Sequence, residues 1–129
     1  MRRRSFFSVL ISAGTLVAGW PGIGRGWLEA DPVRPLLAAL RQGDSAAVVG
    51  AAFLRQHPGE ADARHLGTTV AAELRCRGCD PLRASRRRVR RAISEQMRED
   101  FAHGRLVDVD GWVLSATEAR LYGLAALAT

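Results

Sequence analysis

The stretch from Asp100 to Leu127 constrains the fold more than any other part of the chain, because its local signals agree with one another. Gly104 follows a long helical pattern and suits the left-handed position that ends a helix. Asp110-Gly111 lies between two short apolar runs and predicts a hairpin with a type I′ turn, in which both central residues have positive φ. Ser115, with Glu118 three residues later, forms a capping box that begins a terminal helix.

The predicted hairpin is too small to be stable alone, since an isolated two-stranded hairpin is marginal in water. We therefore expect it to lie on helices, with Trp112 as its anchor. Asp108 and Asp110 could form a metal pair, but the sequence favours Asp110 as a turn former and Asp108 as a solvated strand residue. Glu118 has a second interpretation as a lone catalytic carboxylate, although its place in the capping box already explains it.

Four helical patterns precede this stretch. Asp-Pro pairs at 31–32 and 80–81 each supply an N-cap and a proline at the first helical position, which predicts the starts of the first and fourth helices. The second pattern runs to His57, and the third covers about 60–75. The fourth helix, about 20 residues long, has an apolar stripe at a spacing of four, formed by Val89, Ile93, Met97 and Phe101. The predicted fold class is mainly α: residues 31–129 form a single small helical domain of four to five helices with one short β-hairpin before the C-terminal helix.

The first residues have the composition of an export signal. Three arginines precede an apolar run from Phe6 to Gly19, which is shorter than the roughly 20 residues that span a bilayer. Arg3-Arg4-Ser5-Phe6-Phe7 resembles the bacterial twin-arginine (Tat) signal, which has two arginines, a variable residue, phenylalanine and a second apolar residue. The resemblance covers only about the first 20 to 30 residues of the leader and linker at 1–30, and it implies export of a folded protein to the periplasm or to the periplasmic side of the membrane. An ordinary Sec signal and an uncleaved anchor stay open, because Val17-Ala18-Gly19 is only a passable cleavage site.

The positive charge is concentrated in one segment. The formal net charge is +6, every basic residue is an arginine, and eight of the 19 arginines lie between residues 75 and 91 beside a single acid, Asp80. Such a run would suggest nucleic acid in a cytoplasmic protein, but export and the lack of interleaved aromatic residues argue against that partner. Two interpretations stay open, a solvated helix face and a docking face for an acidic protein or an anionic membrane surface. The predicted partner-docking residues are Arg86, Arg87, Arg90, Arg91 and Trp112.

Cys76-Arg77-Gly78-Cys79 is the one motif with obvious chemical potential. The βαβ pattern of thioredoxin-like folds is absent from the sequence, the haem motif would need histidine where Asp80 stands, and a zinc site would need two further ligands. The three histidines, His57, His65 and His103, lack the spacing of a second ligand pair. A disulfide or incidental pair, a redox pair made reactive by the neighbouring arginines, and a metal site using Cys76 and Cys79 stay open.

The sequence contains no recognisable catalytic constellation, so we predict no catalytic residue and no cofactor. The expected function is that of a small exported accessory subunit that docks on a larger periplasmic or membrane-bound partner, of which an oxidoreductase is one class. The alternative is a small redox or metal-handling protein that uses the Cys76–Cys79 pair.

Overall fold

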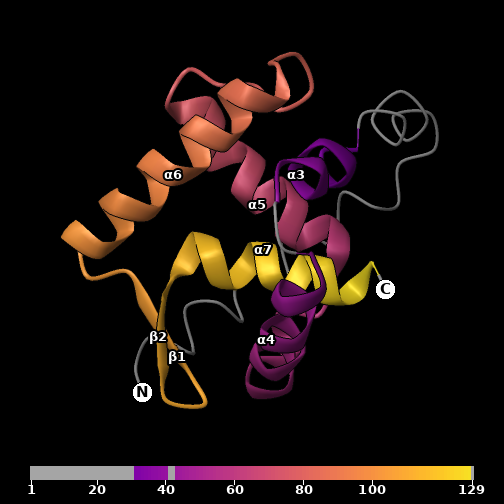
Figure 1. The fold of residues 1–129 in the computed structure, drawn as a ribbon, viewed down its shortest axis with the longest axis vertical. Coiled ribbons are helices and arrows are strands. Elements are labelled where there is room, and N and C mark those ends of the chain that lie inside the picture. Colours follow the sequence, from indigo (N-terminus) through magenta and orange to yellow (C-terminus); the bar gives the residue numbers. More distant parts are fainter. Residues whose placement is uncertain (1–30, 41–42, 129) are drawn as a thin grey trace, which may run out of the picture. The chain divides into compact units, whose positions relative to one another are not determined.

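The computed structural model describes residues 31–40 and 43–128, so the twin arginine at Arg3-Arg4 lies outside the described residues. Five α-helices and one hairpin make up this part of the chain, which confirms the predicted fold class (Figure 1). In chain order they are α3 (Val33–Ala39), α4 (Gly43–Gln56), the 3₁₀ turn η1 (Pro58–Glu60), α5 (Ala63–Cys76), α6 (Arg86–Ala102), β1 (Leu106–Val109), β2 (Trp112–Ser115) and α7 (Ala116–Leu127). None of the described helices is long and apolar enough to cross a membrane.

Helix α7 lies at the centre of the described fold, in contact with the four other helices and with both strands (Figure 1). The largest fully buried side chains come from α3, α5, α6 and α7 and from the strands, and among them are Leu36, Leu66, Leu74, Leu121 and Leu124. The closest helix pair is α4 and α7. A Cβ atom added at Gly50 of α4 would lie 1.7 Å from the backbone carbonyl oxygen of Tyr122 in α7, so only glycine permits this approach.

Two helices begin at caps that the sequence analysis did not identify. Helix α5 begins after Asp62, whose carboxylate accepts hydrogen bonds from the amides of Arg64 and His65 at 2.9 and 3.3 Å. Helix α6 begins after Ser85, whose hydroxyl accepts a hydrogen bond from the Arg88 amide at 3.2 Å. The predicted start of α6 at the Asp-Pro pair 80–81 is wrong, because Pro81 is buried and the pair forms a separate turn.

The hairpin has the predicted turn. Asp110 and Gly111 have φ values of 52° and 87°, and Val109 pairs with Trp112 across the turn. The Asp108 carboxylate accepts a hydrogen bond from the Gly111 amide at 2.9 Å, and the Asp110 carboxylate accepts one from Gln56 of α4 at 3.0 Å. Asp108 therefore stabilises the turn itself, and Asp110 connects the turn to α4.

The prediction that Trp112 anchors the hairpin is wrong, because its side chain is 71% exposed. Val109 and Leu114 are buried and provide the anchor instead. Helix α4 contacts β1, so the last residue of β1 is covered while Trp112, opposite it on β2, projects into solvent.

The terminal helix begins as predicted, since the Ser115 hydroxyl accepts a hydrogen bond from the Glu118 amide at 3.0 Å. The Glu118 carboxylate accepts a hydrogen bond from the Tyr122 hydroxyl at 2.8 Å. Burial, together with this hydrogen bond, raises the pKa of Tyr122 to about 12. In a complete capping box the Glu118 carboxylate would accept a hydrogen bond from the Ser115 amide. Here it accepts one from Tyr122, one turn later in the helix.

Candidate functional site

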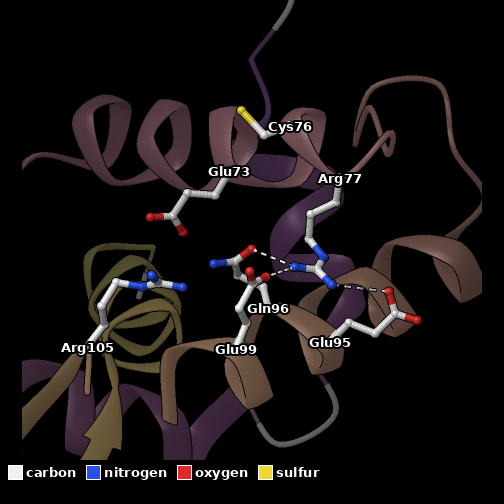
Figure 2. Close-up of a pocket in the computed structure, with 7 residues that line it drawn as sticks. All are labelled: Glu73, Cys76, Arg77, Glu95, Gln96, Glu99 and Arg105. Carbon is white, nitrogen blue, oxygen red and sulfur yellow. Dashed lines mark hydrogen bonds and ion pairs between the residues drawn. The ribbon is translucent and has the colours of Figure 1, made fainter. Parts of the chain in front are cut away.

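An open cleft of about 800 Å³ lies where the C-terminal end of α5, the middle of α6 and the residue before β1 meet (Figure 2). Its lining comprises three glutamates, two arginines, a glutamine and a cysteine, namely Glu73, Cys76, Arg77, Glu95, Gln96, Glu99 and Arg105. Only Cys76 and Arg77 belong to the predicted candidate motif. Of the other five, Glu73 lies one turn earlier on α5, Glu95, Gln96 and Glu99 share one side of α6, and Arg105 precedes β1.

The charged groups of this cleft neutralise one another. Arg77, which directly follows α5, forms ion pairs with Glu95, at 3.7 Å, and with Glu99, both on α6 (Figure 2). Glu73 pairs with Arg120 of α7 at 3.0 Å. These pairs hold the end of α5 against α6 and α7, and Cys76 is the one thiol among the lining residues.

Next to the cleft, Asp100 connects three elements. Its side chain is only 1% exposed, and it accepts hydrogen bonds from Gln96 at 3.2 Å, from Arg105 at 2.9 Å and from the Thr117 amide at 3.0 Å. Burial alone would raise the pKa of this carboxyl, but the hydrogen bonds from Thr117, Arg105 and Gln96 outweigh that effect and lower it. The negative charge also lies at the N-terminus of α7, where the helix dipole favours it. Asp100 therefore joins the end of α6 and the start of β1 to the start of α7.

The burial of Asp100 corrects the predicted apolar stripe of α6. Phe101 was expected to face the core but is 49% exposed, whereas Gln96 and Asp100 are buried. The core-facing residues of α6 are Val89, Ala92, Ile93, Gln96 and Asp100. At the C-terminal end of the helix the buried face is therefore polar, because it meets Arg105 and Thr117 rather than apolar side chains.

The cysteine pair occupies the C-terminal end of α5. Both thiols are free, with Cys76 exposed and Cys79 buried among core residues. The Cys79 amide donates to the Leu74 carbonyl at 2.9 Å and the Gly78 amide donates to the Arg75 carbonyl at 2.9 Å, which is the hydrogen-bond pattern of a Schellman motif. Cys79 is thus the apolar residue that this helix end packs against the core, and Cys76 alone faces solvent. In Figure 2 its sulfur points away from the charged groups of the cleft.

The residues that could assist the thiols have other partners. Arg75 pairs with Asp80 at 3.4 Å, and Arg77 pairs with the glutamates of α6. The ring of His57 contacts the Phe53 carbonyl oxygen at 3.2 Å, and that of His103 contacts the Glu99 carbonyl oxygen at 2.9 Å. Within residues 31–40 and 43–128, no group of three or more histidine, cysteine or acidic side chains is placed to hold a metal ion.

The arginines of the run 86–91 differ in their contacts. Arg90 is half-buried and donates to the Ala39 carbonyl at 3.3 Å, so it packs α6 against the end of α3. Arg86, Arg87, Arg88 and Arg91 are exposed, and the described part of the chain places no carboxylate against them. Trp112 lies in the hairpin that follows the opposite end of α6 (Figure 1). The predicted docking residues therefore belong to two separate surfaces.

The described residues form a small helical domain in which the charged groups of the cleft pair with one another. Comparisons with protein-family models, with curated proteins and with solved structures give no match to this chain.

Proposed function

We propose that this protein is an exported accessory subunit whose hairpin docks on a larger periplasmic or membrane-bound protein. Export rests on the Tat-like leader around Arg3-Arg4. Docking rests on one observation: the hairpin exposes three large apolar side chains, Leu106, Trp112 and Val113, which we call the hairpin surface.

The strand register divides the three residues of this surface between the two faces of the hairpin. Asp108 pairs with Val113, and Leu106 pairs with Ser115, so Leu106 and Val113 are diagonal neighbours on the outer face of the sheet. Trp112 lies on the other face, paired with the buried Val109, and its exposed ring projects into solvent beside the turn. Exposed tryptophan is costly in a free monomer and is among the residues that contribute most to binding at protein interfaces. An apolar pocket that can take the indole ring is the partner feature that suits it.

The hairpin charge adds a second requirement for the partner. Asp108 and Asp110 are exposed beside the apolar residues, and the segment 106–115 contains no basic residue. An interface commonly has an apolar centre and a polar rim. The partner pocket should therefore be bordered by basic side chains.

The test is affinity capture of the tagged full chain from periplasmic and membrane fractions, compared between two alanine variants. Trp112→Ala should weaken the association with the partner at least about 30-fold, since a central aromatic residue commonly contributes 2 kcal/mol or more. Val48→Ala is the matched control, because Val48 is 73% exposed on α4, eight residues before Gln56, whose side chain contacts the hairpin turn. Both variants should keep the unfolding temperature of the parent chain.

Two results would refute this function. One is a monomer that recovers no stoichiometric partner from either fraction. The other is a partner whose recovery is equal for the parent chain, for Trp112→Ala and for Val48→Ala.

A redox or metal-handling role is the second candidate, supported by the exposed, unpaired thiol of Cys76 at the cleft. It requires Cys79 to leave the core before the two sulfurs can act together, because Cys79 is 5% exposed. Metal analysis and thiol titration of the purified chain test this candidate. A metal-free protein whose behaviour is unchanged by Cys76→Ser would eliminate it.

A further inference from the structure

The outward face of α6 has a regular pattern of exposed residues, which is separate from the hairpin. Arg87, Arg91, Ser94, Arg98 and Phe101 follow one another at steps of four, three, four and three residues, and all five are exposed. This spacing places them in one row along the side of the helix opposite its buried residues. From Arg87 to Phe101 the row is about 21 Å long at 1.5 Å per residue. We call Arg87, Arg91 and Arg98 the arginine stripe.

The stripe has no compensating acid in the described part of the chain. Glu95 and Glu99 lie on the flank of α6 that faces the cleft, where Arg77 engages them, and Asp100 faces the core. The first turn of α6 also contains no acidic residue, so its arginines oppose the helix dipole. Folding stability therefore does not explain the arginine stripe, whereas an external anion would.

One exposed apolar side chain lies at the C-terminal end of this row, and another lies in the turn before α6. Phe101 ends the row, and Leu82 is exposed in the turn that leads into α6. No aromatic residue lies between these two positions, so the row lacks the stacking platform of single-stranded nucleic-acid binders. The cleft lies on the flank of α6 that faces α5, whereas the row lies on the side of the helix opposite its buried residues. Cations flanked by exposed apolar side chains suit an interface that offers phosphates together with acyl chains.

We propose that α6 lies along an anionic membrane surface, with the arginine stripe bound to lipid phosphate groups. Guanidinium groups donate two parallel hydrogen bonds to phosphate oxygens, which lysine cannot do. Phe101 and Leu82 then reach the boundary between head groups and acyl chains. This contact is independent of the hairpin surface, which lies beyond the C-terminal end of α6 and stays free for a protein.

The experiment measures binding of the full chain to vesicles. The stripe variant carries Arg87→Gln, Arg91→Gln and Arg98→Gln. The matched control carries Arg34→Gln, Arg55→Gln and Arg64→Gln, three exposed arginines outside α6, and so has the same net charge. Cosedimentation uses phosphatidylcholine vesicles with and without about 30% phosphatidylglycerol, at low and high salt.

The parent chain should bind the phosphatidylglycerol vesicles, and binding should weaken as salt rises. The stripe variant should bind about 100-fold more weakly, at about fivefold for each arginine near the surface. The control should stay within about threefold of the parent, because its arginines belong to α3, α4 and α5 and not to the arginine stripe. Unfolding temperatures of both variants that are no lower than that of the parent chain would exclude misfolding as the cause.

Three outcomes would overturn the proposal. Equal losses in both variants would reduce the effect to net charge. Equal binding of the parent chain to neutral vesicles would assign the contact to apolar insertion alone. Stripe-dependent binding to a DNA duplex, without binding to phosphatidylglycerol vesicles, would make nucleic acid the occupant. None of these results would bear on capture through Trp112.

Discussion

At the scale of single residues, Asp100 is the side chain on which the C-terminal half of the fold depends. It is the one buried carboxylate that joins α6, β1 and α7, through Gln96, Arg105 and Thr117. Asp100→Asn keeps the shape but removes the charge, and a hydrogen bond to a charged group contributes about 1.5–3 kcal/mol. We expect the free energy of unfolding to fall by that amount in urea titrations. Asp44→Asn, in the exposed first turn of α4, should change it by less than about 0.5 kcal/mol.

The pH dependence of stability should report the same group. The pKa of Asp100 is lowered from its ordinary value of 3.8, so the unfolded chain binds this proton more readily than the folded one. The stabilisation is fully present above the unfolded pKa and is lost as pH falls through the folded pKa. Urea titrations between about pH 2 and 7 should show a steeper acid loss for the parent chain than for Asp100→Asn. Parallel curves for the two proteins would contradict this assignment.

The two cysteines should differ in reactivity because their environments differ. Cys76 is exposed and Cys79 is buried in the core. A thiol reagent added to the native chain should attach once, at Cys76, and twice after unfolding in urea, as read by intact mass. Cys79→Ser should lower the free energy of unfolding by about 1–3 kcal/mol, because a buried hydroxyl loses its water partners. Cys76→Ser should leave it unchanged, and rapid double labelling of the native chain would contradict the structure.

At the scale of elements, the packing of α4 against α7 sets the tightest requirement. Alanine favours an isolated helix over glycine by about 1 kcal/mol, so Gly50→Ala would stabilise α4 alone. In the fold, however, its Cβ would collide with the Tyr122 carbonyl, and the backbones would have to separate. We expect a loss of at least about 3 kcal/mol in thermal or urea unfolding.

The control for this packing prediction is Gly59→Ala in η1, where an added Cβ meets no atom within 4 Å. It should change stability by less than about 0.5 kcal/mol. A Gly50→Ala variant as stable as the parent chain would mean that α4 and α7 do not approach as closely as the structure shows.

Elements with local determinants could be predicted from the sequence. The turn at Asp110-Gly111 and the cap at Ser115 each depend on residues within a few positions, and both are confirmed. The orientation of Phe101 and Trp112 depends on which distant elements cover them, and both predictions of burial are wrong. Periodicity alone could not identify Asp100 as buried, since its partner Thr117 comes 17 residues later.

The cleft was missed for a related reason. Its lining joins α5, α6 and the start of β1, and Arg77 reaches Gln96 across 19 residues of sequence. The CxxC motif identifies Cys76 as a candidate, but it does not predict that Glu95 and Glu99 of α6 form ion pairs with the neighbouring Arg77. Short-range spacing can identify single charged or reactive residues. Which of them form ion pairs with one another depends on how the helices pack.

At the scale of the whole molecule, the exposed arginines of α6 lower the stability of the fold, although we propose that they bind an external anion. Arg86, Arg87, Arg88 and Arg91 stand close together on the first two turns of α6, and no described acid compensates them. Their mutual repulsion and the helix dipole both oppose folding at low ionic strength. Salt screens this repulsion, with a Debye length of about 30 Å at 0.01 M and about 8 Å at 0.15 M. The unfolding temperature of the parent chain should therefore rise between these two salt concentrations.

Removing part of this repulsion should have the same effect as salt. Arg87→Gln with Arg91→Gln should raise the free energy of unfolding at low salt by about 0.5–1 kcal/mol, since each charge near a helix terminus contributes about 0.3–1 kcal/mol. The gain should shrink at high salt, because screening has already removed the repulsion. Arg55→Gln with Arg64→Gln, at exposed sites outside α6, should give no such gain. If the first pair of changes destabilised the chain instead, the arginines would be stabilising α6 within the monomer, and an external anion would no longer be needed to explain them.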